Sequence, residues 1–292
     1  MVDFFKKIED ANEPYLIAEI GINHNGDMNI AKKLIDATNA CGWDCAKFQK
    51  RDPDLCVPKH QKQVRRDTPW GEMTYIDYKH KVEFGEKEYN IIDRYCRDKP
   101  LDWTASVWDI GSLNFMDNYD VPFIKIPSAH ITNTSLLEEL SKINVPIILS
   151  TGMSNWKMID KAVNILDKGK VEYALLHSNS TYPAPRNELN LRVIPEMQKR
   201  YDCIIGYSGH EYDLEPTALA VALGAKIIER HITLDHEMWG TDHQSSLEVH
   251  AMDSLGKRIR GIYEIMGKSN KLYPIGFPKL DHVMQTAIYL HM

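Results

Sequence analysis

Eight short apolar runs, each followed by a stretch with helical spacing, are the feature that most limits how this chain of 292 residues can fold. Several of the runs are apolar throughout rather than alternating, which is typical of parallel strands covered on both faces. We therefore expect strands over residues 15–20, 44–49, 102–107, 122–126, 146–150, 173–178, 203–208 and 226–230.

The stretches between these runs place apolar residues three and four positions apart, as a helix with one buried face requires. Helices are expected over 29–42, 86–98, 134–143, 158–169, 191–201, 213–225 and 248–267. Gly42, Gly169 and Gly224 stand at or near the ends of three of them, where a residue in the left-handed conformation is common.

Alternation of eight strands with helices over about 250 residues predicts an α/β fold, a single (β/α)8 TIM barrel. A doubly wound open sheet is the alternative, but no GxGxxG motif follows the first strand. We expect an N-terminal segment at 1–14, the barrel domain at 15–268 and a short C-terminal tail at 269–292.

One connection is much longer than the others. Residues 50–82 separate the second strand from its helix, so we expect a long β2–α2 loop. Loops of this length in compact domains are usually lids or binding loops. A solvated excursion is the alternative, and the aromatic residues Trp70, Tyr75 and Tyr78 favour a binding loop.

Composition narrows the class of protein. The net charge of −6 argues against a general binder of nucleic acid or of anionic membranes. No run is long enough to span a membrane, and the N-terminus lacks the apolar core of a signal peptide. The five cysteines are odd in number and lack zinc-ribbon spacing, which indicates free thiols. We expect a cytoplasmic protein without nucleic-acid or membrane partners.

Polar side chains stand at the end of every predicted strand. In a TIM barrel these ends meet on one face, where the active site lies. The residues concerned are Glu19, Lys47, Gln49, Ser106, Lys125, Ser150, Thr151, His177, Asn179, Ser180, Ser208, His210, Glu229 and His231.

Two features of this face indicate an anionic ligand. Lys47 and Lys125 lie within apolar strands, where an unpaired ammonium group is costly. A salt-bridged or snorkelling lysine is the alternative for each. Residues 150–156 run from strand through glycine to helix start, which suits a phosphate but also resembles an ordinary helix cap.

His210 and His231 end consecutive strands and should therefore be neighbours in space. Two neutral imidazoles with open coordination positions suit Mn²⁺, Fe²⁺ or Zn²⁺. A structural histidine is the alternative for each taken singly.

Ordered motifs across the chain resemble those of the N-acetylneuraminate (sialic acid) synthase family. They are AEIGINHNGD (18–27), KIPSAHITN (125–133), LSTGMS (149–154), LLHSNSTYPAP (175–185), GYSGHE (206–211), ERHITLD (229–235) and TDHQSSLE (241–248). MTYIDYKHKVEF (73–84) and WTASVWD (103–109) are similar to the branch named after spore-coat polysaccharide synthesis.

The resemblance implies an enzyme, a phosphoenolpyruvate-dependent sugar-acid synthase of the transferase class, active in carbohydrate and polysaccharide biosynthesis. Its substrates would be phosphoenolpyruvate and an N-acetylated hexosamine aldehyde similar to N-acetylmannosamine. Its products would be a nine-carbon 2-keto sugar acid and phosphate, formed by C–O cleavage. A divalent metal, Mn²⁺ or Mg²⁺, would activate the aldehyde.

The resemblance also implies a role for individual residues. Glu19 would position or deprotonate the attacking water, and His210 and His231 would be catalytic as ligands of the metal. The residues holding phosphoenolpyruvate would be Lys47, Ser106, Lys125, Ser150 and Ser208. The residues lining the sugar site would be Gln49, Ser180, Tyr182, Glu229 and Asp242.

The chain departs from the family pattern at a few places. His130, Ser180 and Val107 stand where the family often has glutamate, asparagine and proline, which puts the exact substrate in doubt. Members usually carry a C-terminal antifreeze-like domain that contributes an arginine to the partner's sugar site. About 25 residues follow the last predicted helix, too few for that domain. We therefore expect sugar binding that is weaker, differently supplied or completed by another polypeptide. Family members commonly form homodimers, so a homodimer is possible here.

Two other functions remain open. The first is a non-catalytic or partner-dependent TIM-barrel subunit that binds a sugar phosphate. The second is a metal-dependent aldolase or hydrolase on the same barrel, against which the two strand lysines argue.

Overall fold

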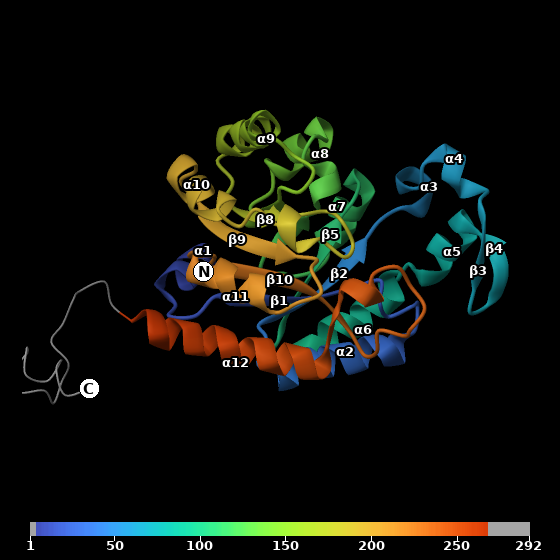
Figure 1. The fold of residues 1–292 in the computed structure, drawn as a ribbon. Helices are drawn as coiled ribbons and strands as arrows, with labels where there is room; N and C mark the ends of the chain where they lie inside the picture. Colours follow the sequence, from blue (N-terminus) through green and yellow to red (C-terminus); the bar gives the residue numbers. More distant parts are fainter. Residues whose placement is uncertain (1–3, 268–292) are drawn as a thin grey trace, which may run out of the picture.

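The computed structural model describes residues 4–267, and within them eight parallel strands close into a barrel (Figure 1). The strands are β1 (Tyr15–Gly21), β2 (Cys45–Lys50), β5 (Asp102–Val107), β6 (Ile124–Ile126), β7 (Ile147–Ser150), β8 (Tyr173–Ser178), β9 (Ile204–Gly209) and β10 (Ile227–Thr233). The barrel closes where β10 pairs with β1, with Tyr15 opposite Ile227. The predicted TIM barrel is confirmed.

Helices cover the outside of the barrel. They are α2 (Met28–Ala40), α6 (Glu86–Arg97), α7 (Ile110–Met116), α8 (Thr134–Leu140), α9 (Trp156–Gly169), α10 (Val193–Arg200), α11 (Glu215–Ala222) and α12 (Val249–Met266). Three single turns, η1 (Ser128–His130), η2 (Arg186–Glu188) and η3 (His243–Ser245), and a short strand β11 (Leu247–Glu248) lie in the loops. Helix α7, which follows β5, was not predicted.

The prediction for Gly169 was wrong. Helix α9 ends at Gly169, and the left-handed residue is Lys170, with φ 58°. Glycine is required at 169 for another reason, because a Cβ atom there would lie 2.5 Å from the carbonyl oxygen of Ser141. Gly42 and Gly224 have positive φ, as expected.

Strand residues divide between two apolar clusters according to the face on which they lie. Leu16 and Ala18 pack against the outer helices, whereas Ile17 points into the barrel. The interior cluster occupies the N-terminal end of the barrel and includes Phe5 and Ile8 of α1 (Phe4–Asp10). The N-terminal segment therefore contributes a helix that closes this end.

We expect Ile8→Ala to lower the free energy of unfolding by about 2 kcal/mol or more, because Ile8 is 4% exposed and its loss leaves a cavity in the interior cluster. Urea denaturation followed by circular dichroism measures the change. Glu9→Ala, an exposed position on the same helix, is the control and should change the stability by less than about 0.5 kcal/mol. Equal effects of the two substitutions would contradict a role of α1 in closing the barrel.

The long connection after β2 is an ordered lobe. It contains α3 (Pro53–Cys56), α4 (Lys59–Lys62), an antiparallel hairpin of β3 (Arg65–Thr68) and β4 (Gly71–Thr74), and α5 (Tyr75–Val82). The lobe stands beside the barrel at the C-terminal ends of the strands (Figure 1). We call residues 53–82 the lobe below.

No helix over residues 4–267 is long and apolar enough to cross a membrane. All five cysteines are free. The predicted tail at 269–292 lies outside the described residues.

Candidate active site

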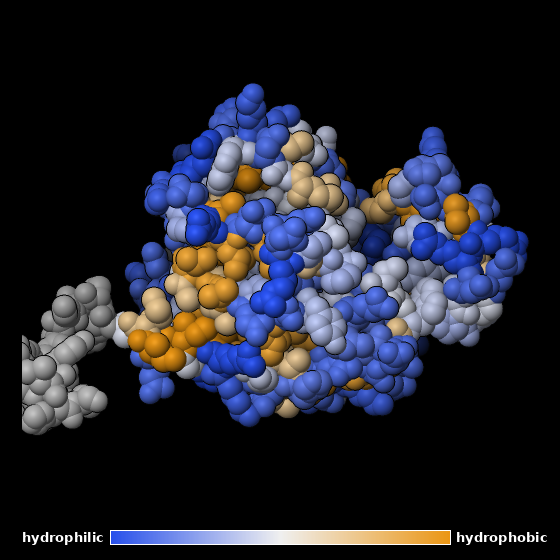
Figure 2. Space-filling view, viewed as in Figure 1, coloured by the Kyte–Doolittle hydropathy of each residue, from blue (hydrophilic) through white to orange (hydrophobic). Residues whose placement is uncertain are grey.

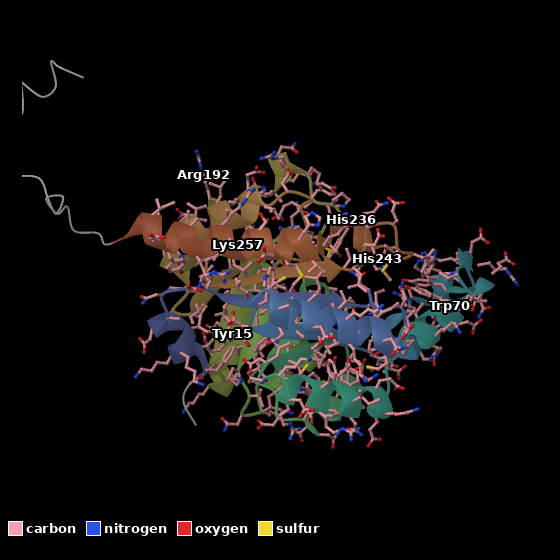
Figure 3. All side chains as sticks on the ribbon, turned by 90° about the horizontal axis from the view of Figure 1, so that it is seen from below. Tyr15, Trp70, Arg192, His236, His243 and Lys257 are labelled. Carbon is pink, nitrogen blue, oxygen red and sulfur yellow. The ribbon has the colours of Figure 1, made fainter. Side chains whose placement is uncertain are left out.

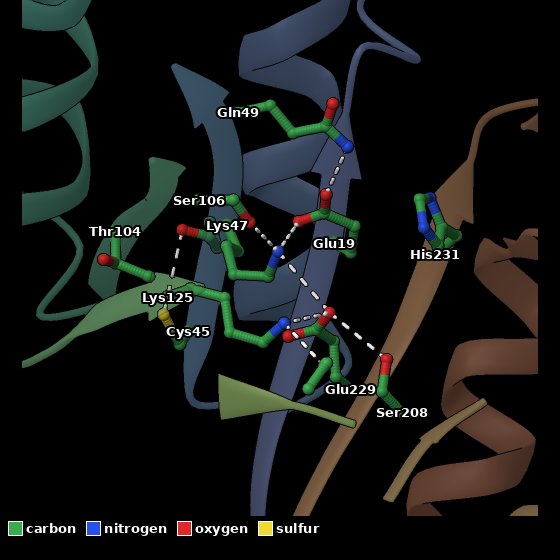
Figure 4. Close-up of polar contacts among 12 residues, drawn as sticks. Glu19, Cys45, Lys47, Gln49, Thr104, Ser106, Lys125, Ser208, Glu229 and His231 are labelled. Carbon is green, nitrogen blue, oxygen red and sulfur yellow. Dashed lines mark hydrogen bonds and ion pairs between the residues drawn. The ribbon is translucent and has the colours of Figure 1, made fainter. Parts of the chain in front are cut away.

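Beyond the interior apolar cluster, charged side chains lie inside the barrel toward the C-terminal ends of the strands. Figure 4 shows Glu19, Lys47, Lys125 and Glu229 in contact there. Lys47 Nζ lies 2.5 Å from Glu19 Oε2 and 3.5 Å from Glu229 Oε1. Lys125 Nζ lies 3.5 Å from the same Glu229 oxygen. All four side chains are at most 5% exposed. The two predicted strand lysines are therefore salt-bridged, and they share one buried layer.

Hydroxyl groups from neighbouring strands complete this layer. Lys47 donates to Ser106 Oγ at 2.9 Å, and Lys125 donates to Ser150 Oγ at 2.8 Å. Ser208 donates to Glu229 Oε1 at 3.3 Å. Each hydroxyl can also donate a hydrogen bond to a ligand bound beside the lysines, because a hydroxyl group both donates and accepts hydrogen bonds.

Burial and mutual charge set the protonation of this layer. Burial raises the pKa of Glu19, although Lys47 opposes the shift. Burial also lowers the pKa of Lys125 to about 8, and the neighbouring Lys47 adds to the effect. Burial would raise the pKa of Glu229, but Lys125 and Lys47 outweigh it and hold the pKa at about 2. Of the two lysines, Lys125 is therefore the one whose charged form a bound anion would stabilise more.

The two predicted histidines lie side by side, His210 directly after β9 and His231 in β10, with ring centroids 5.5 Å apart. The Tyr182 hydroxyl lies 2.7 Å from His210 Nε2 and 3.5 Å from His231 Nε2, so both nitrogens face one point. His210 Nδ1 donates to the carbonyl of Asn179, which leaves the lone pair on Nε2. Burial lowers the pKa to about 3 for His210 and about 4 for His231, so both rings are neutral near pH 7.

This donor set fits a divalent metal ion. Neutral imidazole nitrogens that converge on one point are good ligands for such ions, and the carbonyl behind His210 fixes its orientation. The Asp242 carboxylate lies 4.0 Å from His231 Nδ1 and can do the same for that ring. Over residues 4–267 no group of three or more His, Cys, Asp or Glu side chains could hold a metal. Two imidazoles alone would leave coordination positions for water and substrate oxygens.

A series of hydrogen bonds and an ion pair links Glu19 to Glu83, the residue directly after the lobe. Gln49 Nε2 donates to Glu19 Oε1 at 2.8 Å, and Arg51 donates to Gln49 Oε1 at 2.5 Å. Arg51 Nε is 3.2 Å from Glu83 Oε2, just after α5. Arg51 and Glu83 were missed in the sequence. Arg51 follows directly on the polar end of β2, which was the available signal.

Ser180 is the predicted site residue that stands apart. It lies beside Gly152, where no side chain would fit, and lines a cavity of about 1420 Å³ between α9 and α10. The interior layer, the two histidines, Tyr182 and Asp242 therefore lie together at the mouth of the barrel. Ser180 lies outside this group.

A second cavity, of about 750 Å³, lies at the barrel mouth between the lobe and the loops after β8, β9 and β10. The surface of the lobe is mostly hydrophilic, and the molecule is hollowed between lobe and barrel (Figure 2). Pro183 and Thr241 line this cavity, and each is next in sequence to a candidate site residue, Tyr182 and Asp242.

A TIM barrel with paired lysines and carboxylates inside and two converging imidazoles at its mouth defines a class of barrel enzymes that act on anionic substrates. The model of the NeuB family matches residues 34–271, so the chain belongs to the NeuB family. The predicted resemblance to sialic acid synthases is confirmed.

Individual relatives agree with this assignment. The chain is 36% identical over 260 residues to N-acetylneuraminate-9-phosphate synthase of Homo sapiens, covering 88% of this chain and 72% of that protein. It is 35% identical over 261 residues to N,N'-diacetyllegionaminic acid synthase of Campylobacter jejuni, covering 88% of this chain and 78% of that protein. The solved structure of an N-acetylneuraminic acid synthetase from Leptospira borgpetersenii superposes with a TM-score of 0.82 at 31% identity, covering 96% and 92% of the two chains.

Membership in this family defines the reaction type. The chain is an enzyme, a phosphoenolpyruvate-condensing synthase of the transferase class, and the family's condensation produces nonulosonic acids, the nine-carbon 2-keto sugar acids. Enzymes of this family are metal-dependent and act in carbohydrate biosynthesis.

Proposed function

We propose that this chain condenses phosphoenolpyruvate with an N-acetylated hexosamine aldehyde similar to N-acetylmannosamine, and releases phosphate by C–O cleavage. The observation that carries the proposal is the buried layer in which Lys47 and Lys125 each bind a serine hydroxyl within reach of Glu19 and Glu229. Two ammonium groups in an enclosed, low-dielectric site suit the phosphate and carboxylate of phosphoenolpyruvate.

Phosphoenolpyruvate is held by Lys47, Ser106, Lys125, Ser150 and Ser208 in this proposal. Its negative charge takes over part of the pairing that Glu19 and Glu229 give to the lysines in the free protein. The resemblance implies that Glu229 lines the sugar site. Glu229 contacts both lysines and Ser208, however, and these contacts favour a role in orienting them.

The condensation needs a nucleophilic carbon, an activated aldehyde and a water molecule. The enol carbon of phosphoenolpyruvate attacks the aldehyde carbon, water adds to the resulting cationic carbon, and the tetrahedral centre expels phosphate. Glu19 accepts the proton of the water, and its raised pKa makes it a stronger base than an exposed carboxylate. The lysines stabilise the departing phosphate.

His210 and His231 hold Mn²⁺ or Mg²⁺ in this proposal. When bound, the ion supplies a Lewis acid for the aldehyde oxygen. Tyr182 and Asp242 contact the two imidazoles and therefore lie where the sugar must enter. Gln49 orients Glu19 and lines the same side, and Ser180 lines the neighbouring cavity.

The proposal is tested by phosphate release, which should require phosphoenolpyruvate, metal and the sugar together. With ¹⁸O in the bridging position of phosphoenolpyruvate, the label should leave with the phosphate. Phosphate release without sugar contradicts the proposal. Turnover of sugar acids without phosphoenolpyruvate would favour the aldolase or hydrolase, and ligand binding without turnover would favour the non-catalytic subunit.

The pH dependence follows from Lys125. Its pKa of about 8 lies below the usual lysine value of 10.5, so the ammonium loses its proton as pH rises above 8 and the anion is bound less well. We expect kcat/KM for phosphoenolpyruvate to fall about tenfold per pH unit above pH 8. In Lys125→Arg the cation persists, so any remaining activity should lack this fall. A profile that is flat to pH 10 in the unchanged protein contradicts the assignment.

Four properties other than the reaction are also proposed or left to experiment: the domain bounds, the localisation, the oligomeric state and the identity of the sugar. We propose that the barrel domain spans 15–268, that the protein works in the cytoplasm, and that it forms a homodimer. The human and Campylobacter relatives are named as synthases of different sugar acids. Activity assays with several hexosamines would identify the sugar that this chain uses.

A further inference from the structure

The two histidines of the candidate metal site lie just where the pairing of their strands ends. The last pair in the register of β9 with β10 is Gly209 opposite Arg230. His210 and His231 each follow one residue later in the chain. The separation of 5.5 Å between their ring centroids is therefore fixed by contacts other than this sheet pairing.

Arg230 supplies one such contact. Because side chains alternate along a strand, His231 points into the barrel and Arg230 points outward, like the buried neighbours Ile228 and Ile232. The guanidinium of Arg230 donates to the main-chain carbonyl groups of Glu211 and Asp213. Arg230 thus ties the segment directly after β9 to β10.

The carboxylate of Glu211 closes a set of bonds on the outer side of the two strands. Glu211 Oε1 lies 3.1 Å from Arg230 Nη1 and accepts from the Thr217 hydroxyl of α11 at 2.8 Å. Glu211 Oε2 accepts from the Tyr207 hydroxyl of β9 at 2.8 Å. Thr217 also accepts from Arg230 at 2.8 Å. We call Tyr207, Glu211, Thr217 and Arg230 the outer network.

The ion pair of the outer network is fully buried. Arg230 is 0% exposed and is the largest fully buried side chain over residues 4–267, and the Glu211 side chain is 1% exposed. Taking two charges out of water costs about as much as their attraction returns, so such a pair adds little stability over apolar residues of similar size. What it provides is direction, because the planar guanidinium fixes the groups to which it donates.

Gly209 shows how closely Glu211 packs behind the histidines. A Cβ atom at residue 209 would lie 2.6 Å from Glu211 Oε2 and 2.8 Å from Glu211 Oε1. A side chain at this position would therefore displace the carboxylate. Glycine before His210 thus allows the ion pair to lie directly against the strand end.

A second contact joins the same segment to the loop after β10 nearer the surface. Tyr212 and His236 have ring centroids 5.6 Å apart. Figure 3 labels His236 and His243 on this loop, at the same end of the barrel as Trp70 of the lobe. Tyr212 is 66% exposed, so its contact constrains the segment less than the buried outer network does.

We propose that Arg230 and Glu211 are positioning residues for the metal site. Their buried ion pair holds the segment after β9 against β10, so that Nε2 of His210 and Nε2 of His231 face one point. The inference rests on the proposed function, because it takes the two histidines as metal ligands. Arg230 and Glu211 act through the histidines, from the outer side of the strands.

A double substitution tests the inference without leaving a buried charge unpaired. In Arg230→Met, Glu211→Leu the apolar side chains are similar in size to those they replace, so the fold should be retained, which thermal unfolding checks. The dissociation constant of Mn²⁺, measured by electron paramagnetic resonance, should rise about 10- to 100-fold, the usual effect of losing a residue that orients a metal ligand. The dissociation constant of phosphoenolpyruvate, measured by calorimetry, should stay within about twofold.

The control for this variant removes an ion pair elsewhere. Arg200 and Asp160 pair at 2.5 Å between α10 and α9, on the outside of the barrel. The double substitution Arg200→Gln, Asp160→Asn should leave Mn²⁺ affinity unchanged. A loss of Mn²⁺ affinity in this control equal to that in Arg230→Met, Glu211→Leu would overturn the inference.

Gly209→Ala is a second test, which moves the Glu211 carboxylate while both charges remain. It should also weaken Mn²⁺ binding about tenfold or more and leave phosphoenolpyruvate binding within about twofold. Gly261→Ala on α12 is its control, because nothing lies within 4 Å of the added Cβ atom. If Arg230→Met, Glu211→Leu does not fold, the comparison of Gly209→Ala with Gly261→Ala decides the inference.

The outcomes separate the inference from the proposed function. A folded Arg230→Met, Glu211→Leu variant with unchanged Mn²⁺ affinity overturns the positioning role and leaves the metal site intact. Equal weakening of Mn²⁺ and phosphoenolpyruvate binding also overturns it, in favour of a general disturbance of the barrel mouth. If the unchanged protein binds Mn²⁺ but releases no phosphate, the condensation fails, whereas the Mn²⁺ titrations still decide the role of the ion pair.

Discussion

Replacing His231 by alanine is expected to lower kcat at least about 10³-fold, because one of the two nitrogens that face the Tyr182 hydroxyl is lost and the proposed metal site keeps only one imidazole. Phosphoenolpyruvate should still bind, since the lysine layer is unchanged. Titration with Mn²⁺, followed by electron paramagnetic resonance, measures the loss of metal affinity directly. His210→Ala should behave in the same way.

A matched control exists for these substitutions. His250 is 80% exposed on α12, so His250→Ala should change neither Mn²⁺ affinity nor kcat. Thermal unfolding of each variant shows whether the fold is retained. Full Mn²⁺ affinity in a folded His210→Ala, His231→Ala double variant would remove the metal site from the account.

Replacing Lys47 by methionine is expected to weaken phosphoenolpyruvate binding about 100- to 1,000-fold. Lys47 is 1% exposed and pairs with both Glu19 and Glu229, so its loss leaves two carboxylates facing a bound anion without their shared cation. Glu19, whose pKa is already raised, can take up a proton, which allows the variant to fold. Calorimetric titration with phosphoenolpyruvate gives the dissociation constant.

Glu19→Gln separates binding from chemistry at the same ion pair. It removes the proposed base but retains a group that can bond to Gln49 and Lys47, so kcat should fall while phosphoenolpyruvate binds as well as before or better. If Lys47→Met and Glu19→Gln both leave the dissociation constant within threefold, the buried layer does not hold phosphoenolpyruvate.

The barrel could be predicted because its strands are apolar on both faces and are separated by periodic helices. Helix α7 was missed because it has seven residues, one of them Gly111, which gives too short a pattern. The hairpin of β3 and β4 was missed because its residues are mostly polar and none is buried, so no alternation of apolar and polar residues marks it.

The interior layer could be predicted because a closed barrel brings every strand end to one face. The same argument explains the sequence around Glu229: Glu229 and His231 point inward, whereas Arg230 points outward and pairs with Glu211 at 3.1 Å. Residues that reach the site from loops far along the chain could not be predicted from strand ends. Arg66 and Lys79 reach the mouth only because the lobe folds back over it.

The most direct measurement is a crystal structure with Mn²⁺ and phosphoenolpyruvate, using the anomalous signal of manganese. The central claim predicts one strong manganese peak bonded to Nε2 of both His210 and His231, and phosphoenolpyruvate density in contact with the ammonium groups of Lys47 and Lys125. Manganese bound away from both imidazoles, or phosphoenolpyruvate found outside the barrel while both lysines keep their carboxylate partners, would contradict it.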